Sequence, residues 1–316
     1  TYGFPFDLTE DILRSKNIKV NKKEFNDSLE KQKAKARQNW SGTGSKATDK
    51  IWFDILSNTT LTDFLGYEEE SGAAIIQSIV VKDKIVNTTS VNDEAVLILN
   101  QTTFYGESGG QIGDTGIIKN DDFSASVNDT QKNGDYILQI CKLTKGSIGN
   151  NLSVDCTVDS DRRNSIMVNH TATHLLHQSL KDVLGSHVNQ AGSLVHPEYL
   201  RFDITHPNKI SSTELDDIEL IVNQKIGENI TVDTSIKSLE EAKKEGATAL
   251  FGEKYGDNVR VVTIGEFSKE LCGGTHVLNT GKISKFKIKH EKAISSGIRR
   301  IHDITCLLYT SDAADE

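Results

Sequence analysis

The stretch VNHTATHLLH, residues 168–177, decides how the second half of the chain folds and what it can bind. From about residue 161 to Gly185, apolar side chains recur every three or four residues, which predicts a helix that ends at a glycine. His170 and His174 are four residues apart within it, so both project from one helix face, within reach of a single ion. A lone histidine on such a helix is more often an ordinary buried or surface imidazole.

A second pair of candidate ligands, Cys272 and His276 in CGGTH, has the same four-residue spacing. Thiolate and imidazole are the ligands that zinc prefers, and the two pairs together supply a complete set of three nitrogens and one sulfur. His177 lies on the neighbouring edge of the helix and could be mistaken for a further ligand. The sequence therefore predicts a zinc site made of His170, His174, Cys272 and His276.

Two glycine-rich segments are candidates for binding. Gly273 and Gly274 permit close backbone approach and positive φ, so their amides could point at a developing oxyanion; the alternative is a tight turn and nothing more. The run FYGESGGQIGDTG, residues 104–116, lacks the ending and the strand-to-helix context of a phosphate-binding loop. On spacing alone, a glycine-rich hairpin explains it.

The first half of the chain predicts a β-rich domain. Short β-branched runs between about residues 50 and 158 are separated by polar turn clusters, which favours a small antiparallel barrel or sandwich. The segment SGTGSKATD, residues 41–49, has the composition of a flexible connection, and a helix with a basic face precedes it at about residues 25–37. The predicted strands are 75–81, 95–99, 136–140 and 153–158.

After the long helix, helices and hairpins are interleaved without a regular βαβ repeat, so we expect an α+β domain. Ser211 and Glu214 form a capping-box pattern before a second helix, and Ser238 with Glu241 starts a short one that ends at Gly246. We expect strands at 188–195, 199–204, 230–236, 259–264 and 285–289, and the first two place polar Gln190, Ser193, Arg201 and Asp203 among apolar neighbours.

The charge balance limits the partners. The 316 residues carry 36 Lys and Arg against 45 Asp and Glu, a net charge of −9 that opposes non-specific binding to polyanions over the whole surface. Residues 282–300, however, hold seven basic residues and one acid. This segment is either a solvated face or a contact for phosphates, and the sequence does not choose between them.

Composition excludes several classes of protein. The chain is too long for a disulfide-folded or zinc-folded miniprotein, and its apolar runs are too short to span a membrane. The four cysteines form no CxxC pair, which is typical of a reducing, cytoplasmic compartment. The start TYGFPFDLTED has no targeting signal, so we expect it to be internal to a longer protein.

These motifs together resemble one family, the alanyl-tRNA synthetases. The resemblance covers most of residues 1–302 and is carried in order by TYGFPFDLT, FYGESGGQIGDTG, HTATHLLH, QAGSLV, LRFD, ALFGEKYGD, LCGGTH and SGIRRI. The histidine and cysteine set alone also occurs in threonyl-tRNA synthetases and in free-standing editing proteins, which lack TYGFPFDLT. The family's ATP-binding and adenylate-forming motifs are absent from this chain.

The resemblance implies that the chain is a fragment of an enzyme that attaches alanine to tRNA(Ala) with ATP and Mg²⁺. ATP and Mg²⁺ would bind only the aminoacylation part, whose motifs are missing from this chain. The resemblance implies four segments: 1–45, the end of the aminoacylation and tRNA-recognition region; 46–158, the barrel-like domain; 159–302, a zinc-dependent editing core; and 303–316, a non-native tail. The editing core would use one Zn²⁺ to hydrolyse seryl- or glycyl-tRNA(Ala) at its 3′ aminoacylated end. Alternatives are a free-standing hydrolase and a non-catalytic, zinc-stabilised tRNA-binding module.

The resemblance also assigns residues to roles. Gln190 matches the family's editing-site glutamine and would orient water or substrate, with Thr171 and the amides of Gly273 and Gly274 as helpers. Zinc would either activate water or, as we favour for a site with four protein ligands, position the substrate. The tRNA-binding candidates are Lys285, Lys287, Lys289, Arg299 and Arg300.

Overall fold

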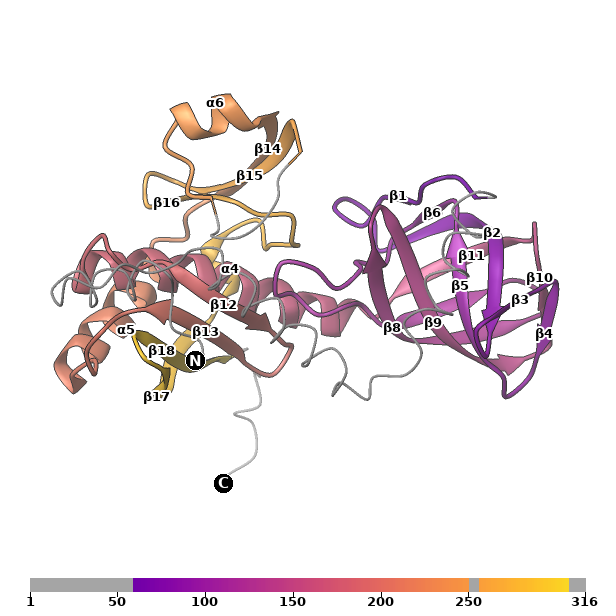
Figure 1. Ribbon diagram of the computed structural model, residues 1–316, viewed down its shortest axis with the longest axis horizontal. Helices are drawn as coiled ribbons and strands as arrows, with labels where there is room; N and C mark the ends of the chain where they lie inside the picture. Colours follow the sequence, from indigo (N-terminus) through magenta and orange to yellow (C-terminus); the bar gives the residue numbers. More distant parts are fainter. Residues whose placement is uncertain (1–58, 250–255, 307–316) are drawn as a thin grey trace, which may run out of the picture. The chain divides into compact units, whose positions relative to one another are not determined.

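Two segments are described by the computed structural model, residues 59–249 and 256–306. The predicted basic helix at 25–37, the connection at 41–49 and most of the predicted tail lie outside them. Within these segments the chain is mostly β, with three α-helices and one short 3₁₀-helix (Figure 1).

Six antiparallel strands close into a barrel in the order β11–β7–β8–β9–β5–β2, and β2 pairs again with β11. One long strand makes the closure possible, because the first half of β2 pairs with β11 and its second half with β5. The six strands are β2 (Ser71–Val81), β5 (Glu94–Leu99), β7 (Gly116–Lys119), β8 (Ser124–Asn133), β9 (Tyr136–Lys145) and β11 (Ser153–Val158). The predicted antiparallel barrel and its four predicted strands are confirmed.

The barrel interior is filled by alternate side chains of these strands. In β11, Val154, Cys156 and Val158 are buried and the residues between them are exposed, as the two-residue period of a strand requires. Cys141 of β9 joins Cys156 in this apolar core. Short strands complete the region: β1 (Asp63–Phe64), β3 (Lys84–Val86), β4 (Thr88–Ser90), β6 (Gln101–Thr102) and β10 (Ser147–Gly149).

The long predicted helix is α4 (Ser160–Leu184). The side chain of Asp159 caps its start by accepting a hydrogen bond from the Arg162 amide, and it ends at Gly185, whose φ of 112° favours glycine. From Ile166 to Leu180 most of its side chains are buried, so α4 is a central element rather than a surface helix.

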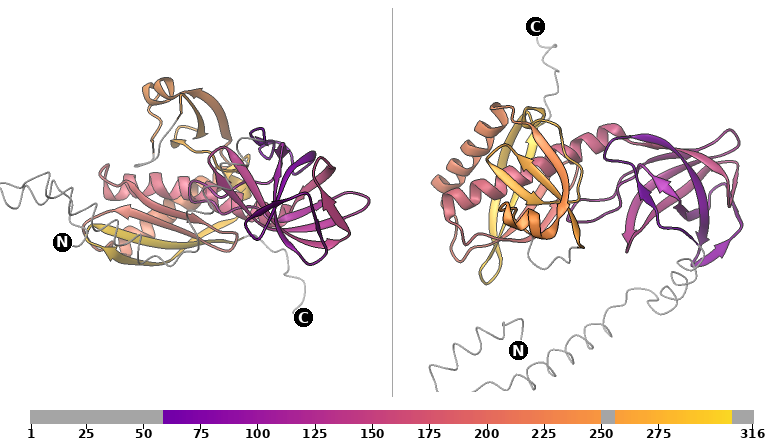
Figure 2. Two further views of the ribbon diagram at one scale, coloured as in Figure 1. Left: turned by 45° about the vertical axis from the view of Figure 1, so that its right-hand side comes forward. Right: turned by 90° about the horizontal axis from the view of Figure 1, so that it is seen from above.

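A four-stranded antiparallel sheet packs against α4, in the order β12–β13–β18–β17. Apolar residues of one sheet face, among them Phe202, Phe286 and Ile301, form a single core with α4 and α5. Figure 2 shows α4 running along this face. The elements are β12 (Gln190–Val195), β13 (Leu200–Thr205), α5 (Ser212–Gly227), β17 (Lys285–Ser295) and β18 (Ile298–Cys306).

A smaller antiparallel sheet, β14–β15–β16, carries α6 and leads into the CGGTH segment. Both predicted capping boxes are confirmed, at Ser211 with Glu214 and at Ser238 with Glu241. The elements are β14 (Val232–Ser238), α6 (Leu239–Lys244), β15 (Asn258–Ile264), β16 (Ser268–Leu271) and the 3₁₀-helix η1 (Thr280–Lys282).

Strand β18 continues past residue 302, where the predicted tail begins. Its residues 303–306 pair with β17, and Asp303 also pairs with Leu200 of β13. The first four residues of that segment are therefore part of the sheet. No helix in the described part of the chain is long and apolar enough to span a membrane.

Candidate metal centre and adjoining cavity

The two predicted ligand pairs meet in space. Helix α4 carries His170 and His174 on successive turns, and the segment that follows β16 brings Cys272 and His276 to them. The four ligand atoms lie within 4.8 Å of one another. Cys272 Sγ is 3.4 Å from His170 Nε2 and 3.3 Å from His276 Nε2.

These positions fit one tetrahedral zinc ion. With Zn–S and Zn–N bonds of ordinary length, neighbouring sulfur and nitrogen ligands are roughly 3.5 Å apart. In addition, His174 Nε2 is buried and has no hydrogen-bond partner among the described residues, and its ring belongs to the four-residue cluster, as expected of a metal ligand. The donor set is therefore compatible with one zinc ion.

Each histidine of the cluster is held through its other ring nitrogen. His170 Nδ1 lies 2.7 Å from Gln111 Oε1, and His174 Nδ1 lies 2.7 Å from Glu270 Oε2. His276 Nδ1 is 3.3 Å from the hydroxyl of Thr171, which is fully buried and also accepts the Val277 amide. Such outer partners fix the orientation of metal-binding imidazoles.

His177 is not a member of the cluster. Its Nδ1 donates to Glu270 Oε1 at 2.7 Å, so the Glu270 carboxylate bridges His177 and His174. Burial alone would raise the pKa of Glu270, but the two imidazoles outweigh it and hold that pKa below its usual range. Glu270 is thus ionised, and His177 helps to fix it behind the cluster.

The electrostatics of the cluster favour a thiolate. Burial raises the pKa of Cys272, but the charges of His170 and His276 outweigh burial and hold that pKa well below its usual value. The Gly274 amide also donates to Cys272 Sγ at 3.4 Å. A thiolate is the form of cysteine that binds metal.

The CGGTH segment is tightly fitted at one of its two glycines. A Cβ on Gly274 would overlap the His170 ring and lie 2.8 Å from Gln111 Oε1, whereas a Cβ on Gly273 would meet only Tyr67 Oη at 4.0 Å. Neither glycine has positive φ, so close approach is the property that the segment uses.

Side chains from outside the segment hold its carbonyl groups. Arg260 Nη1 donates to Gly274 O at 2.8 Å and to Cys272 O at 3.2 Å. Tyr67 donates to Gly273 O at 2.6 Å, and the Arg260 guanidinium lies 4.2 Å from the centre of the Tyr67 ring. The backbone beside the thiolate is therefore fixed at three successive residues.

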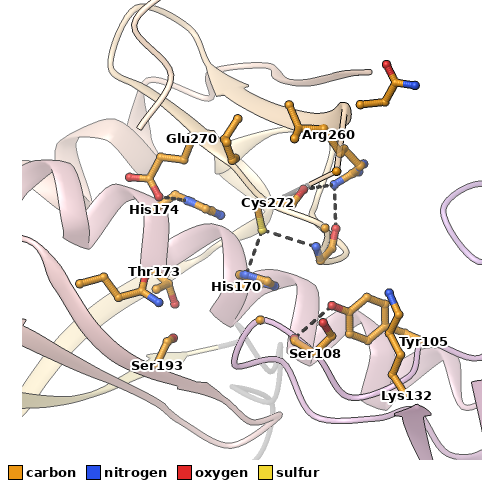
Figure 3. Close-up of a pocket in the computed structure, with 18 residues that line it drawn as sticks. Tyr105, Ser108, Lys132, His170, Thr173, His174, Ser193, Arg260, Glu270 and Cys272 are labelled. Carbon is orange, nitrogen blue, oxygen red and sulfur yellow. Dashed lines mark hydrogen bonds and ion pairs between the residues drawn. The ribbon is translucent and has the colours of Figure 1, made fainter. Parts of the chain in front are cut away.

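A cavity of about 300 Å³ adjoins the cluster, and His170, His174 and Cys272 form part of its wall (Figure 3). Gln190, which is half-buried at the start of β12, lines it, as do Gly273 and Gly274. The remaining polar wall comes from Ser108, Thr173, Ser193, Asn258, Arg260, Glu270 and, on the barrel, Tyr105 and Lys132. Thr171 is not among the lining residues.

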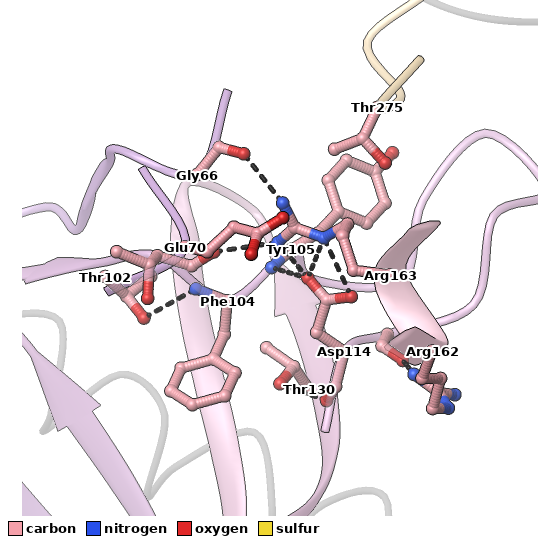
Figure 4. Close-up of polar contacts among 12 residues, drawn as sticks. Gly66, Glu70, Thr102, Phe104, Tyr105, Asp114, Thr130, Arg162, Arg163 and Thr275 are labelled. Atoms are coloured by element: carbon pink, nitrogen blue, oxygen red, sulfur yellow. Dashed lines mark hydrogen bonds and ion pairs between the residues drawn. The ribbon is translucent and has the colours of Figure 1, made fainter. Parts of the chain in front are cut away.

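A buried ion pair ties the first turn of α4 to the barrel (Figure 4). Arg163, 2% exposed, pairs with fully buried Asp114, and its Nε donates to Asp114 Oδ2 at 2.9 Å. The same guanidinium donates to Gly66 O at 2.7 Å and Thr103 O at 2.8 Å. These bonds satisfy a charge that would otherwise be costly to bury.

Several basic side chains of the segment 282–300 are already paired with acidic residues and are therefore not free to bind phosphates. Arg300 forms two hydrogen bonds to Asp203, Arg299 pairs with Glu291, and Lys287 Nζ lies 2.9 Å from Glu219. Lys285 and Lys289 are exposed on β17 and form no ion pair with another described residue. Arg201, a polar candidate from the predicted strand at 199–204, is half-buried on β13.

Sequence reasoning missed the partners behind the ligands. Gln111 lies inside FYGESGGQIGDTG, and Glu270 comes two residues before Cys272. A polar residue beside a predicted ligand is a usable signal for Glu270. No spacing rule connects Gln111 with His170, because they are 59 residues apart, one in a loop of the barrel and the other on α4.

Comparisons with known proteins identify the family of the chain. Residues 1–162 match the family described as tRNA synthetases class II (A), and residues 259–302 match the threonyl and alanyl tRNA synthetase second additional domain. The chain is 46% identical to an alanine–tRNA ligase of Mesorhizobium japonicum and 47% identical to one of Sinorhizobium medicae. Each alignment covers 96% of this chain and 36% of the relative, so the chain spans little more than a third of their length.

Proposed function

Because the chain belongs to the class II tRNA synthetase family, with tRNA as the partner that membership implies, we propose that it is part of a cytoplasmic alanine–tRNA ligase. The parent enzyme attaches alanine to tRNA(Ala) with ATP and Mg²⁺. The part that contains the metal centre hydrolyses seryl- or glycyl-tRNA(Ala) at its 3′ aminoacylated end.

A second site of this kind has a physical reason. A pocket shaped for the methyl side chain of alanine cannot reject glycine by size, and it rejects an added hydroxyl only weakly, because such differences are worth about 1–3 kcal/mol. A separate hydrolytic site selects again, this time for the group that distinguishes the wrong amino acid. Hydroxyl and amide groups of Thr173, Gln190 and Ser193 line the cavity and can hydrogen-bond a seryl hydroxyl.

The observation that carries the proposal is the four-residue cluster, three of whose members form part of the wall of the cavity. His170, His174, Cys272 and His276 would hold one Zn²⁺, which supplies a Lewis acid that either anchors the substrate's amino or hydroxyl group or lowers the pKa of a water. Gln190, which lines the same cavity, orients the ester or the attacking water. Thr171 keeps the His276 ring in place, and the Gly274 amide stabilises the thiolate.

Deacylation of purified seryl-, glycyl- and alanyl-tRNA(Ala) tests this proposal, with the zinc content of each protein measured alongside. We expect the chain without substitutions, called the parent chain below, to hydrolyse seryl- and glycyl-tRNA(Ala) but not alanyl-tRNA(Ala). Cys272→Ala should lose both zinc and deacylation, while Cys156→Ala, a matched change inside the barrel core, should keep both. The proposal is wrong if zinc-free Cys272→Ala clears seryl-tRNA at the parent rate.

The second candidate function is a zinc-stabilised module that binds tRNA without cleaving it. It is favoured by the closed set of four protein ligands, which leaves a tetrahedral ion no position for substrate. Gln190→Ala separates the two functions: loss of deacylation with full zinc content supports hydrolysis. A parent chain that binds zinc and tRNA but clears no substrate supports the binding module.

A further inference from the structure

The glycine-rich loop of the barrel, residues 104–116, lies beside the metal centre because its backbone pairs with the end of β12 at Val195. Ser108 and Gln111 form a tight turn by exchanging backbone hydrogen bonds of 3.1 and 2.9 Å. Val195 then donates to Gly110 O at 2.7 Å, which places the turn beside β12. Gly110 has a φ of 84°, and a Cβ there would lie 2.8 Å from Ser193 O, so a glycine is required.

This turn directs the Gln111 side chain between the two halves of the ligand set. Gln111 is fully buried, and its Nε2 donates to Thr275 Oγ1 at 3.0 Å. Its Oε1 accepts the Thr275 amide at 2.9 Å and lies 2.7 Å from His170 Nδ1. One glutamine thus contacts the ligand helix through His170 and the ligand loop through Thr275.

These contacts determine which nitrogen of His170 carries the proton. A backbone amide only donates, so the Gln111 atom that faces Thr275 N must be the oxygen. The same oxygen faces His170 Nδ1, and therefore Nδ1 must donate to it. In the neutral ring the lone pair is then on Nε2, the nitrogen that faces Cys272 Sγ.

We infer that Gln111 is a positioning residue of the metal centre: by holding His170 in its metal-binding tautomer and Thr275 in place, it makes zinc affinity depend on the docked barrel loop. The His170 ring and the Gln111 side chain have little room to move, because Gly274 packs directly against the His170 ring and Gln111 Oε1. The barrel therefore contributes to the metal site without supplying a ligand. The inference rests on the zinc binding proposed above.

The test compares three variants of the full chain. Gln111→Leu removes both contacts, Gln111→Glu keeps the acceptor for His170 and Thr275, and Gln139→Leu is the matched control. Gln139 is another fully buried barrel glutamine, and it donates to a threonine hydroxyl at 3.2 Å. Zinc affinity is measured by competition with a chelator, and the visible absorption spectrum of the Co²⁺-loaded protein reports the ligand geometry.

We expect Gln111→Leu to bind zinc about 10- to 100-fold more weakly, the usual effect of removing such an outer partner, and to change the Co²⁺ spectrum. Gln111→Glu should restore affinity and spectrum, and Gln139→Leu should match the parent. Parent-like zinc affinity of Gln111→Leu would overturn the inference, as would an equal loss in Gln139→Leu. A parent chain that binds no zinc would instead overturn the proposed metal site.

Discussion

The metal centre and the β17–β18 hairpin contain the two largest groups of functional candidates, and the fold treats their polar groups in opposite ways. Around α4 the groups are buried, and most nitrogens and oxygens have a defined partner; of the two α4 imidazole nitrogens without one, His174 Nε2 belongs to the ligand cluster and His177 Nε2 does not. On the hairpin the basic side chains are more exposed, and three of them are already paired with acids.

The difference teaches how far a pattern along the chain can be trusted. Spacing of four residues predicted the cluster of candidate ligands, because a helix and a tight segment both bring residues at that spacing close together. The count of basic residues at 282–300 overestimated the free charge, because Glu219 comes from α5 and Asp203 from β13. Ligand geometry is local, whereas charge balance on a sheet depends on neighbouring strands.

The largest expected effect breaks the buried side of this comparison. Arg163→Leu leaves Asp114 as an unpaired charge in a site that excludes water, so we expect a loss of about 3–5 kcal/mol in the free energy of unfolding. Arg162→Leu is the control, because that side chain makes one hydrogen bond, of 2.8 Å to Gly113 O. Urea denaturation measures both. Equal losses of unfolding free energy in the two variants would mean that the buried ion pair stabilises the fold no more than the single hydrogen bond of Arg162 does.

The next effect concerns the two glycines of CGGTH. Gly274→Ala forces a methyl group into the His170 ring, so we expect zinc affinity to fall about 100-fold, at the upper end for disturbed ligand orientation. Gly273→Ala meets nothing closer than Tyr67 Oη at 4.0 Å and should keep parent affinity. Chelator competition distinguishes them, and parent affinity in Gly274→Ala would contradict the packing argument.

A smaller effect is expected at Asp303, where the hairpin buries an acid without pairing it. Asp303 is fully buried and neither carboxylate oxygen has a partner among the described residues. Burial, and next the nearby Glu219, raise its pKa well above the usual value. The native state therefore keeps a proton that the unfolded chain has lost, and stability falls as pH rises between the unfolded and the folded pKa.

Asp303→Ala removes both the pH dependence and the unpartnered group, so we expect a gain of about 1–3 kcal/mol, larger at pH 8 than at pH 5. Thermal unfolding across that range measures it, with Asp216→Ala on the exposed side of α5 as the control. A gain that does not grow with pH would contradict the assignment of a neutral carboxyl group.

The smallest effect separates the two interpretations of the basic hairpin. If Lys285 and Lys289 contact phosphates, replacing both with Ala should weaken tRNA binding and reduce the slope of log affinity against log salt by about one for each lysine. Arg300→Ala should change the slope less, because Asp203 already neutralises that guanidinium. An unchanged slope in the double variant would support a solvated face.

Much of the fold was predictable because local patterns carried it. The capping boxes, the glycine at the end of α4 and the β-branched strands are all short-range signals, and the motif resemblance to alanyl-tRNA synthetases is confirmed by the relatives. Strand β8 was missed because SASVNDTQKN is polar, and it is a strand only through pairing with β7 and β9. Barrel closure likewise depends on the pairing of β2 with β11, two strands far apart in the sequence, which local patterns do not reveal.

For the site, the clustering of the four candidate ligands was predictable, and the residues that hold them in place were not. His170, His174, Cys272 and His276 are recognisable by residue type and spacing, since few side chains bind zinc. Gln111 becomes visible only when the barrel loop is placed beside β12. A hydrogen bond between residues so far apart in the sequence leaves no periodic pattern in it.

The closed barrel has one practical consequence for thiol chemistry. Of the three cysteines whose side chains are described, Cys141 and Cys156 lie in its core, and burial raises the pKa of both, that of Cys156 to about 12. Cys272 is half-buried with a lowered pKa, and the thiolate is the form that reacts with alkylating reagents. Once Cys306 is replaced by serine, the rate of alkylation therefore measures the fraction of molecules whose Cys272 is not protected by a metal.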